Sequence, residues 1–265
     1  MAGKDVVQVA GPPSIGGVLT VGVDLAAEPA KTAVAWIDWS PEAASVRRLT
    51  LGSDDALVLE ALREADKAGI DCPFGWPGPF VDFVTAHKNG DVADPHEFAG
   101  REGRRRLALR TTDLFTYDRT GLMPLSVAAD RIGHTAMRCA GLLAQLARDG
   151  QSVDRSGAGA VVEVYPAASL KRWGLPSRGY KRARNVDSLG ASVDALLAAA
   201  PWLSLGNCEN LCRRSDDAFD AVVAAMTARA VSQGLVEPLP DEHASVARSE
   251  GWIALPATSV DALRP

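Results

Sequence analysis

The chain has 265 residues, of which 47% are hydrophobic and 23% charged. This length suffices for one large domain or two small ones, and the composition excludes a disordered chain. The net charge of −5 excludes binding to nucleic acid through an overall positive charge, so any such contact must come from local basic patches. No apolar run reaches the ~18 residues of a membrane span, and we therefore expect no membrane contact.

Two further features of the chain indicate its setting. Four cysteines occur at irregular spacing: Cys72, Cys139, Cys208 and Cys212. So few cysteines fit a reducing cytoplasm better than a disulfide framework, and the protein is expected to be cytoplasmic. Residues 1–17 contain several prolines and glycines and make a poor secretory signal, so a flexible N-terminal arm is predicted.

Short strands dominate the first part of the chain. Residues 18–25 are nearly continuously apolar, as in a strand that is buried on both faces. Strands at 32–39 and 45–51 follow at hairpin-like distances. A helix is then predicted from the N-cap candidates at 53–55 to about Gly69, and a short strand at 70–72 ends in a proline-rich turn.

The second part of the chain adds mostly helices. Residues 77–150 carry few strand signals, so a largely helical insertion is expected there. A buried strand at 160–165 follows, and helices are predicted at 185–200 and 216–233. Residues 251–253 indicate a last docking strand. This order predicts an α/β fold in one domain over 18–256, followed by a tail at 257–265.

Several well-known functional motifs are absent from the sequence. It contains no Walker phosphate loop and no G-x-S-x-G nucleophile elbow, and Gly157 and Gly159 lack the third glycine of a dinucleotide-binding turn. Cys208 and Cys212 have the wrong spacing for a zinc knuckle, so burial is the simpler interpretation of both.

Acidic residues occupy positions where acids are costly. Asp24 interrupts one apolar strand, Asp71 ends another, and Glu163 lies inside a third. Asp217 and Asp220 stand three residues apart at the start of an apolar helix and share one of its faces. A buried unpaired carboxylate costs several kcal/mol, so such residues are usually paired, hydrogen-bonded or bound to a metal.

These acids predict a metal site. The ends of parallel strands meet at one edge of a sheet, so Asp24 and Asp71 are expected to lie together there. With Asp217 and Asp220 they would supply the oxygen ligands that Mg²⁺ or Mn²⁺ prefers. Two such ions about 4 Å apart stabilise the attacking and leaving oxygens of a phosphodiester.

Each acid also has a simpler interpretation. Asp216 and Asp217 suit the positive end of a helix dipole, and Asp24 suits a turn at the end of a strand. Glu163 suits an ion pair with a buried arginine. Only the combination of several such acids favours the metal site.

Two basic segments predict contacts with phosphate. The first contains Arg104, Arg105 and Arg110, and the second contains Lys171, Arg172 and Lys181 with Trp173 and Tyr180 between them. This pattern is typical of backbone phosphate contacts with base stacking, although a solvated helix face would show the same charges. Arg110 lies in the string RTTD and suits either a phosphate contact or a structural ion pair.

The sequence resembles a known family at several motifs that occur in order. They are VGVDLA at 21–26, GIDCPFGWP at 69–77, RTTD at 110–113, EVYPAA at 163–168, DDAFDAVVAA at 216–225 and EGWI at 250–253. Together they are similar to domain-of-unknown-function family 429, and the resemblance spans roughly residues 18 to 256. Members of this family are described as predicted nucleases with an RNase H-like fold.

The resemblance implies a mixed sheet of three antiparallel strands followed by parallel strands, flanked by helices. It matches Asp24 and Asp71 to acids of the RNase H-like superfamily. Asp217 and Asp220 resemble the acidic pair in the last helix of RuvC-type Holliday-junction resolvases. Glu163 has no certain counterpart, and the insertion at 77–150 departs from the minimal fold.

Residues and resemblance together predict a Mg²⁺- or Mn²⁺-dependent nuclease. Asp24, Asp71, Asp217 and Asp220 would bind the metal, and Glu163 would be a ligand or orient water. The nucleic acid could be DNA or RNA. Two alternatives stay open: an ATP-dependent phosphotransferase of the actin-like or sugar-kinase type, and a non-catalytic nucleic-acid-binding scaffold.

Overall fold

The computed structural model describes residues 5–8, 17–91 and 97–265. Most of the predicted flexible arm at 1–17 lies outside these residues. Within the arm, β1 (Asp5–Gln8) pairs antiparallel with β4, so the prediction of a loose segment is wrong for these four residues. No helix in the described ranges is long and apolar enough to cross a membrane.

The centre of the fold is a mixed sheet. Beside β1, its strands are β2 (Val18–Asp24), β3 (Ala33–Trp39), β4 (Ala44–Leu51), β5 (Lys67–Asp71), β6 (Val161–Glu163) and β7 (Leu203–Ser204). Their order is β1-β4-β3-β2-β5-β6, and β7 pairs with β4. Strands β2, β3 and β4 are antiparallel, whereas β5 is parallel to β2 and β6 is parallel to β5. The predicted RNase H-like mixed sheet is thereby confirmed.

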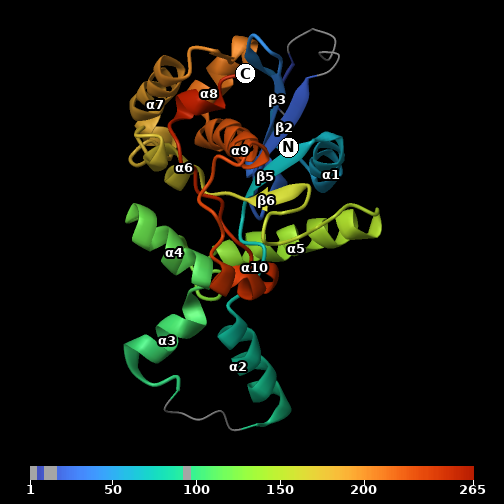
Figure 1. The fold of residues 1–265 in the computed structure, drawn as a ribbon, viewed down its shortest axis with the longest axis vertical. Helices are drawn as coiled ribbons and strands as arrows, with labels where there is room; N and C mark the ends of the chain where they lie inside the picture. Colours follow the sequence, from blue (N-terminus) through green and yellow to red (C-terminus); the bar gives the residue numbers. More distant parts are fainter. Residues whose placement is uncertain (1–4, 9–16, 92–96) are drawn as a thin grey trace.

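Helices cover both faces of this sheet (Figure 1). The described α-helices are α1 (Asp55–Glu64), α2 (Gly78–Asn89), α3 (Gly100–Ala108), α4 (Thr111–Thr120), α5 (Ile132–Arg148), α6 (Pro166–Arg172), α7 (Val186–Ala199), α8 (Glu209–Arg214), α9 (Asp216–Ser232) and α10 (Ala244–Glu250). Side chains of β3 alternate between the two layers: Val34 and Trp36 pack with α1 and α5, whereas Ala35 and Ile37 pack with α7, α8 and α9. This alternation follows from the two-residue period of a strand.

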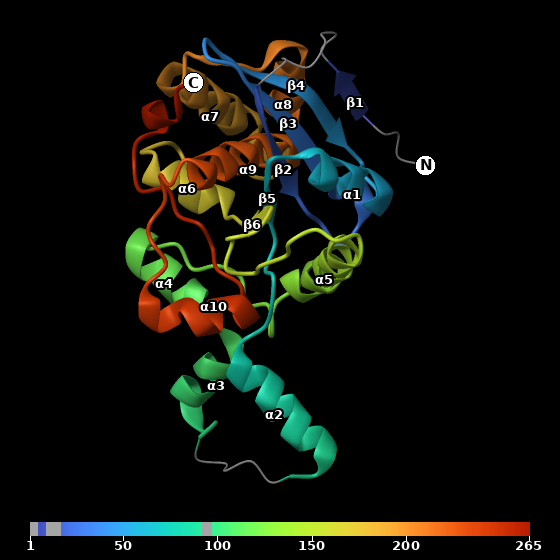
Figure 2. The ribbon, with the colours of Figure 1, turned by 45° about the vertical axis from the view of Figure 1, so that its right-hand side comes forward.

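Two predicted boundaries differ from the structure. The first helix ends at Glu64, and Gly69 belongs to β5. Residues 251–253 form no full strand, and Ile253 makes one isolated parallel bridge with Glu163. The region 77–150 contains α2 to α5, as the sequence indicates. Within it, α2 and α3 extend away from the body of the molecule (Figure 2).

Glycines in the sheet let α9 lie directly on β2 and β5. A Cβ atom at Gly22 would lie 2.0 Å from the Ala221 carbonyl oxygen, and one at Gly69 would lie 2.6 Å from that of Ala224. Any side chain at these positions would push the helix away from the strands. The close contact holds Asp220, which precedes Ala221 on α9, near the end of β2.

Candidate functional site

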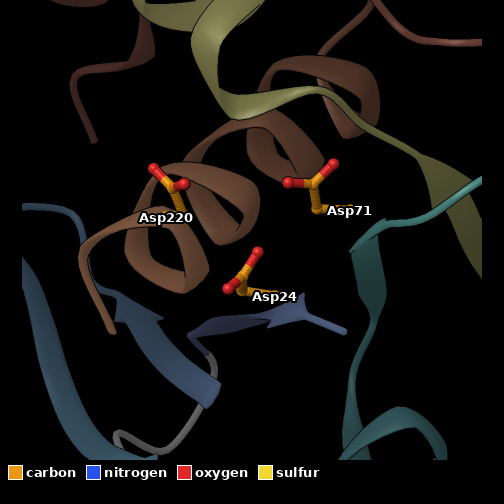
Figure 3. A group of neighbouring side chains, drawn as sticks. All are labelled: Asp24, Asp71 and Asp220. Atoms are coloured by element: carbon orange, nitrogen blue, oxygen red, sulfur yellow. The ribbon is translucent and has the colours of Figure 1, made fainter. Parts of the chain in front are cut away.

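Three of the predicted acids meet at the end of the central strands. Asp24 and Asp71 are register partners at the carboxyl ends of the parallel strands β2 and β5, and α9 adds Asp220. One carboxylate oxygen from each residue lies within 4.8 Å of the others. Figure 3 shows the three carboxylates facing a common centre. We call Asp24, Asp71 and Asp220 the acidic triad.

The acidic triad is electrostatically strained. Burial raises the pKa of Asp24 well above its ordinary value, and the charges of Asp220 and Asp71 raise it further. Burial also raises the pKa of Asp71 to about 7, with a smaller contribution from Asp220. Asp217 lies one turn before Asp220, and burial together with Asp216 and Asp220 raises its pKa to about 6. A cation among these carboxylates would relieve this repulsion.

One loop already brings a cation to the acidic triad. Tyr180 donates a hydrogen bond from its hydroxyl to Oδ1 of Asp220 at 2.8 Å, and Nζ of Lys181 lies 2.6 Å from Oδ2. The next residue, Arg182, donates its backbone N–H to Asp216 at 3.0 Å. Three consecutive residues between α6 and α7 are therefore bound to the first two turns of α9.

The prediction that aromatic side chains of this segment stack on bases is wrong. Trp173 and Tyr180 are 7% and 1% exposed, and both belong to the core cluster under α9. Their position between basic residues reflects alternation between core and surface. Of the basic residues around them, Lys181 alone is placed at the acidic triad.

A cavity of about 520 Å³ adjoins the acidic triad. Asp24, Asp71 and Asp217 line it together with Lys181. Its other walls include Tyr165, Arg178 and apolar side chains from the loop between α4 and α5, such as Leu125. This volume is within the range of small-molecule and cofactor pockets, so the cavity can hold one small ligand or one part of a larger substrate.

Glu163 and Arg110 line the same cavity but are bound to each other. Two parallel hydrogen bonds of 2.7 and 2.9 Å join the Arg110 guanidinium to the Glu163 carboxylate, which also accepts one from Phe74 N. Arg110 further donates to Asp113 and to the Glu250 carbonyl. Both side chains are at most 2% exposed. The structure therefore shows the ion-pair alternative for both residues, in a network that joins the insertion to β6.

The remaining predicted basic residues lie elsewhere. Arg104 and Arg105 are exposed on α3 and line a separate surface pocket. With Arg106 they form an exposed group without an ion pair among the described residues, which we call the α3 arginines. Arg172 is bound to Glu237, and the exposed Lys171 does not line the cavity of the acidic triad.

Three residues that bear on the site were not predicted in their observed roles. Tyr165 and Arg178 line the cavity, and Glu250 accepts hydrogen bonds from the backbone N–H groups of Gly78 and Thr111. Tyr165 and Glu250 belong to the motifs EVYP and EGWI, so position within a motif was the available signal. For Arg178 the sequence offered only its place in a basic segment.

The donor atoms of the acidic triad suit a hard cation. Carboxylate oxygens are the preferred ligands of Mg²⁺ and Mn²⁺. Among the described residues, this triad is the group of three or more His, Cys, Asp or Glu side chains that could hold a metal ion. All four cysteines are free and buried, which agrees with burial as the interpretation of Cys208 and Cys212.

Comparison with known proteins places the chain in a family. No curated protein and no solved structure matches the sequence. A family model described as "Protein of unknown function (DUF429)" matches residues 22–245, which contain all three residues of the acidic triad. The chain therefore belongs to the DUF429 family.

Proposed function

We propose that this protein is a metal-dependent nuclease that hydrolyses phosphodiester bonds at the acidic triad. The observation that carries the proposal is the approach of three carboxylate oxygens within 4.8 Å, at the carboxyl ends of two parallel strands. Asp24, Asp71 and Asp220 would bind Mg²⁺ or Mn²⁺, and Asp217 would complete the ligand set. A bound cation of this kind activates water and stabilises the charge that develops on phosphate.

The protonation of the acids supports a role in binding cations. Asp24 and Asp71 hold protons more tightly than ordinary aspartates do, mainly because they are buried. A metal needs the deprotonated form, so its binding should release protons near neutral pH. Folding would not otherwise favour three crowded carboxylates at this position, since their burial costs free energy.

Cationic side chains support an anionic substrate. Arg178 and Lys181 line the cavity beside the acids. Arg178 is exposed, and among the described residues it donates one hydrogen bond, to the Gly121 carbonyl, so most of its guanidinium is free to bind phosphate. The α3 arginines would contact the nucleic-acid backbone outside the cavity. Four buried free thiols fit a cytoplasmic protein.

The test is cleavage of labelled DNA and RNA, single- and double-stranded, with Mn²⁺, with Mg²⁺ and with EDTA. Cleavage should need the metal and be lost in Asp220→Asn. The matched control is Asp187→Asn, which neutralises an exposed aspartate on α7 and should retain activity. Absence of metal-dependent cleavage on every substrate would contradict the proposal. ATP turnover with a small acceptor would then favour the ATP-dependent phosphotransferase. Nucleic-acid binding without turnover would favour the non-catalytic scaffold.

A further inference from the structure

The ammonium group of Lys181 supplies a positive charge at the acidic triad, where a metal ion would otherwise supply one. Its Nζ lies 2.6 Å from Oδ2 of Asp220, a carboxylate that is 1% exposed. The other oxygen of Asp220 accepts the hydroxyl of Tyr180. Lys181 is thus the positively charged partner of the most buried acid in the triad, and a cation that binds Asp220 through Oδ2 competes with the ammonium group for that oxygen.

The two neighbours that bind Asp220 differ in their freedom to move. Tyr180 is 1% exposed and packs edge-on against Phe219, so it is fixed in the core. The Lys181 side chain is 48% exposed, although its ammonium group contacts Asp220. The backbone beside it is held by the hydrogen bond from Arg182 to Asp216. The lysine side chain can therefore leave Asp220 while the loop stays in place.

We propose that Lys181 is a displaceable cation: a divalent metal ion at the acidic triad displaces its ammonium from Asp220, and the released ammonium then binds the phosphate of the substrate. This inference rests on the proposed function and assigns Lys181 two successive partners at one site. The cavity supports the second role, because both Lys181 and Arg178 line it and a phosphate beside the triad would lie within reach of a flexible lysine.

The first test measures Mn²⁺ affinity by isothermal titration calorimetry. Lys181→Met removes the competing ammonium, so Mn²⁺ should bind about 10- to 100-fold more tightly, as expected when the ion pair between Lys181 and Asp220 no longer has to break. Lys181→Gln tests the same loss of charge with a side chain that can still donate to Asp220, should Lys181→Met fail to fold. The matched control is Arg182→Met, which removes a neighbouring positive charge but keeps the backbone bond to Asp216 and should change the affinity by no more than about twofold.

The second test measures binding of a labelled single-stranded oligonucleotide by fluorescence anisotropy, with Ca²⁺ in place of Mn²⁺. Lys181→Met should weaken this binding about tenfold, and Lys181→Arg should restore most of it because the positive charge is retained. Mn²⁺ affinity that is equal or weaker in Lys181→Met, while the wild type binds Mn²⁺, would overturn this inference and leave the proposed function standing. No Mn²⁺ binding by any of these proteins would overturn both.

Discussion

The ionisation of Asp71 should make the metal-free protein less stable as the pH rises. Burial, more than any neighbouring charge, raises the pKa of Asp71 from 3.8 to about 7 in the folded state. The folded protein therefore binds this proton more tightly than the unfolded chain does. Because of this difference, the free energy of unfolding should fall between about pH 4 and pH 7 and stay low above pH 7.

The structure also sets the size of this effect. A pKa that changes from 3.8 to about 7 corresponds to an upper bound of about 4 kcal/mol in the free energy of unfolding. Asp71 lies among the carboxylates of Asp24 and Asp220, so the three groups share their protons, and we expect about half of that bound. Asp71→Asn keeps the shape of the side chain without its charge. At pH 8 the variant should be about 2 kcal/mol more stable than the wild type, or about 4–8 °C in Tm.

The assay is thermal and urea unfolding at pH 5 and pH 8, in EDTA. The advantage of Asp71→Asn should be present at pH 8 and shrink to about 0.8 kcal/mol at pH 5. At pH 5 the unfolded chain has already lost the Asp71 proton while the folded protein still holds it, so only part of the free-energy difference has developed. Asp187→Asn, at an exposed aspartate, controls for the substitution itself. An Asp71→Asn variant that is less stable than the wild type at both pH values would refute the reasoning.

Three further predictions concern the scaffold and the outer surface. Arg110→Met should cost about 3–5 kcal/mol in urea unfolding, because it leaves the Glu163 carboxylate buried without its partner; a cost below 1 kcal/mol would contradict this. Gly22→Ala should lower Tm sharply because its Cβ would collide with α9, whereas Gly141→Ala, which meets nothing within 4 Å on α5, should be neutral or raise Tm. Replacing the α3 arginines by alanine should flatten the log–log salt dependence of nucleic-acid binding by up to about two to three units, and an unchanged slope would show that they make no phosphate contacts.

The sequence predicts most of the sheet and α9, because these buried elements are formed by apolar runs. Strands β2 and β5 are mainly apolar before Asp24 and Asp71, so the acids mark the ends where parallel strands share an edge. Residues 216–233 likewise predict the buried α9 almost to its ends. The sequence pattern could not show whether Asp217 or Asp220 joins Asp24 and Asp71. That choice depends on how α9 lies against β2 at Gly22.

The charged residues were harder to place than the apolar ones. Lys181 and Arg172 belong to the same basic segment, yet one contacts Asp220 and the other pairs with Glu237. Arg110 and Glu163 lie 53 residues apart, so sequence spacing alone could not pair them. Charge patterning shows that a segment is basic, but the partner of each residue is set by the tertiary fold.

The central claim is that the acidic triad binds a divalent cation, and the most direct measurement is a crystal structure after soaking in Mn²⁺, with anomalous scattering recorded near the manganese absorption edge. We predict an anomalous peak between the carboxylates of Asp24, Asp71 and Asp220, with the ammonium of Lys181 moved away from Asp220. A structure without a peak at millimolar Mn²⁺, in which Lys181 still contacts Asp220, would contradict the claim.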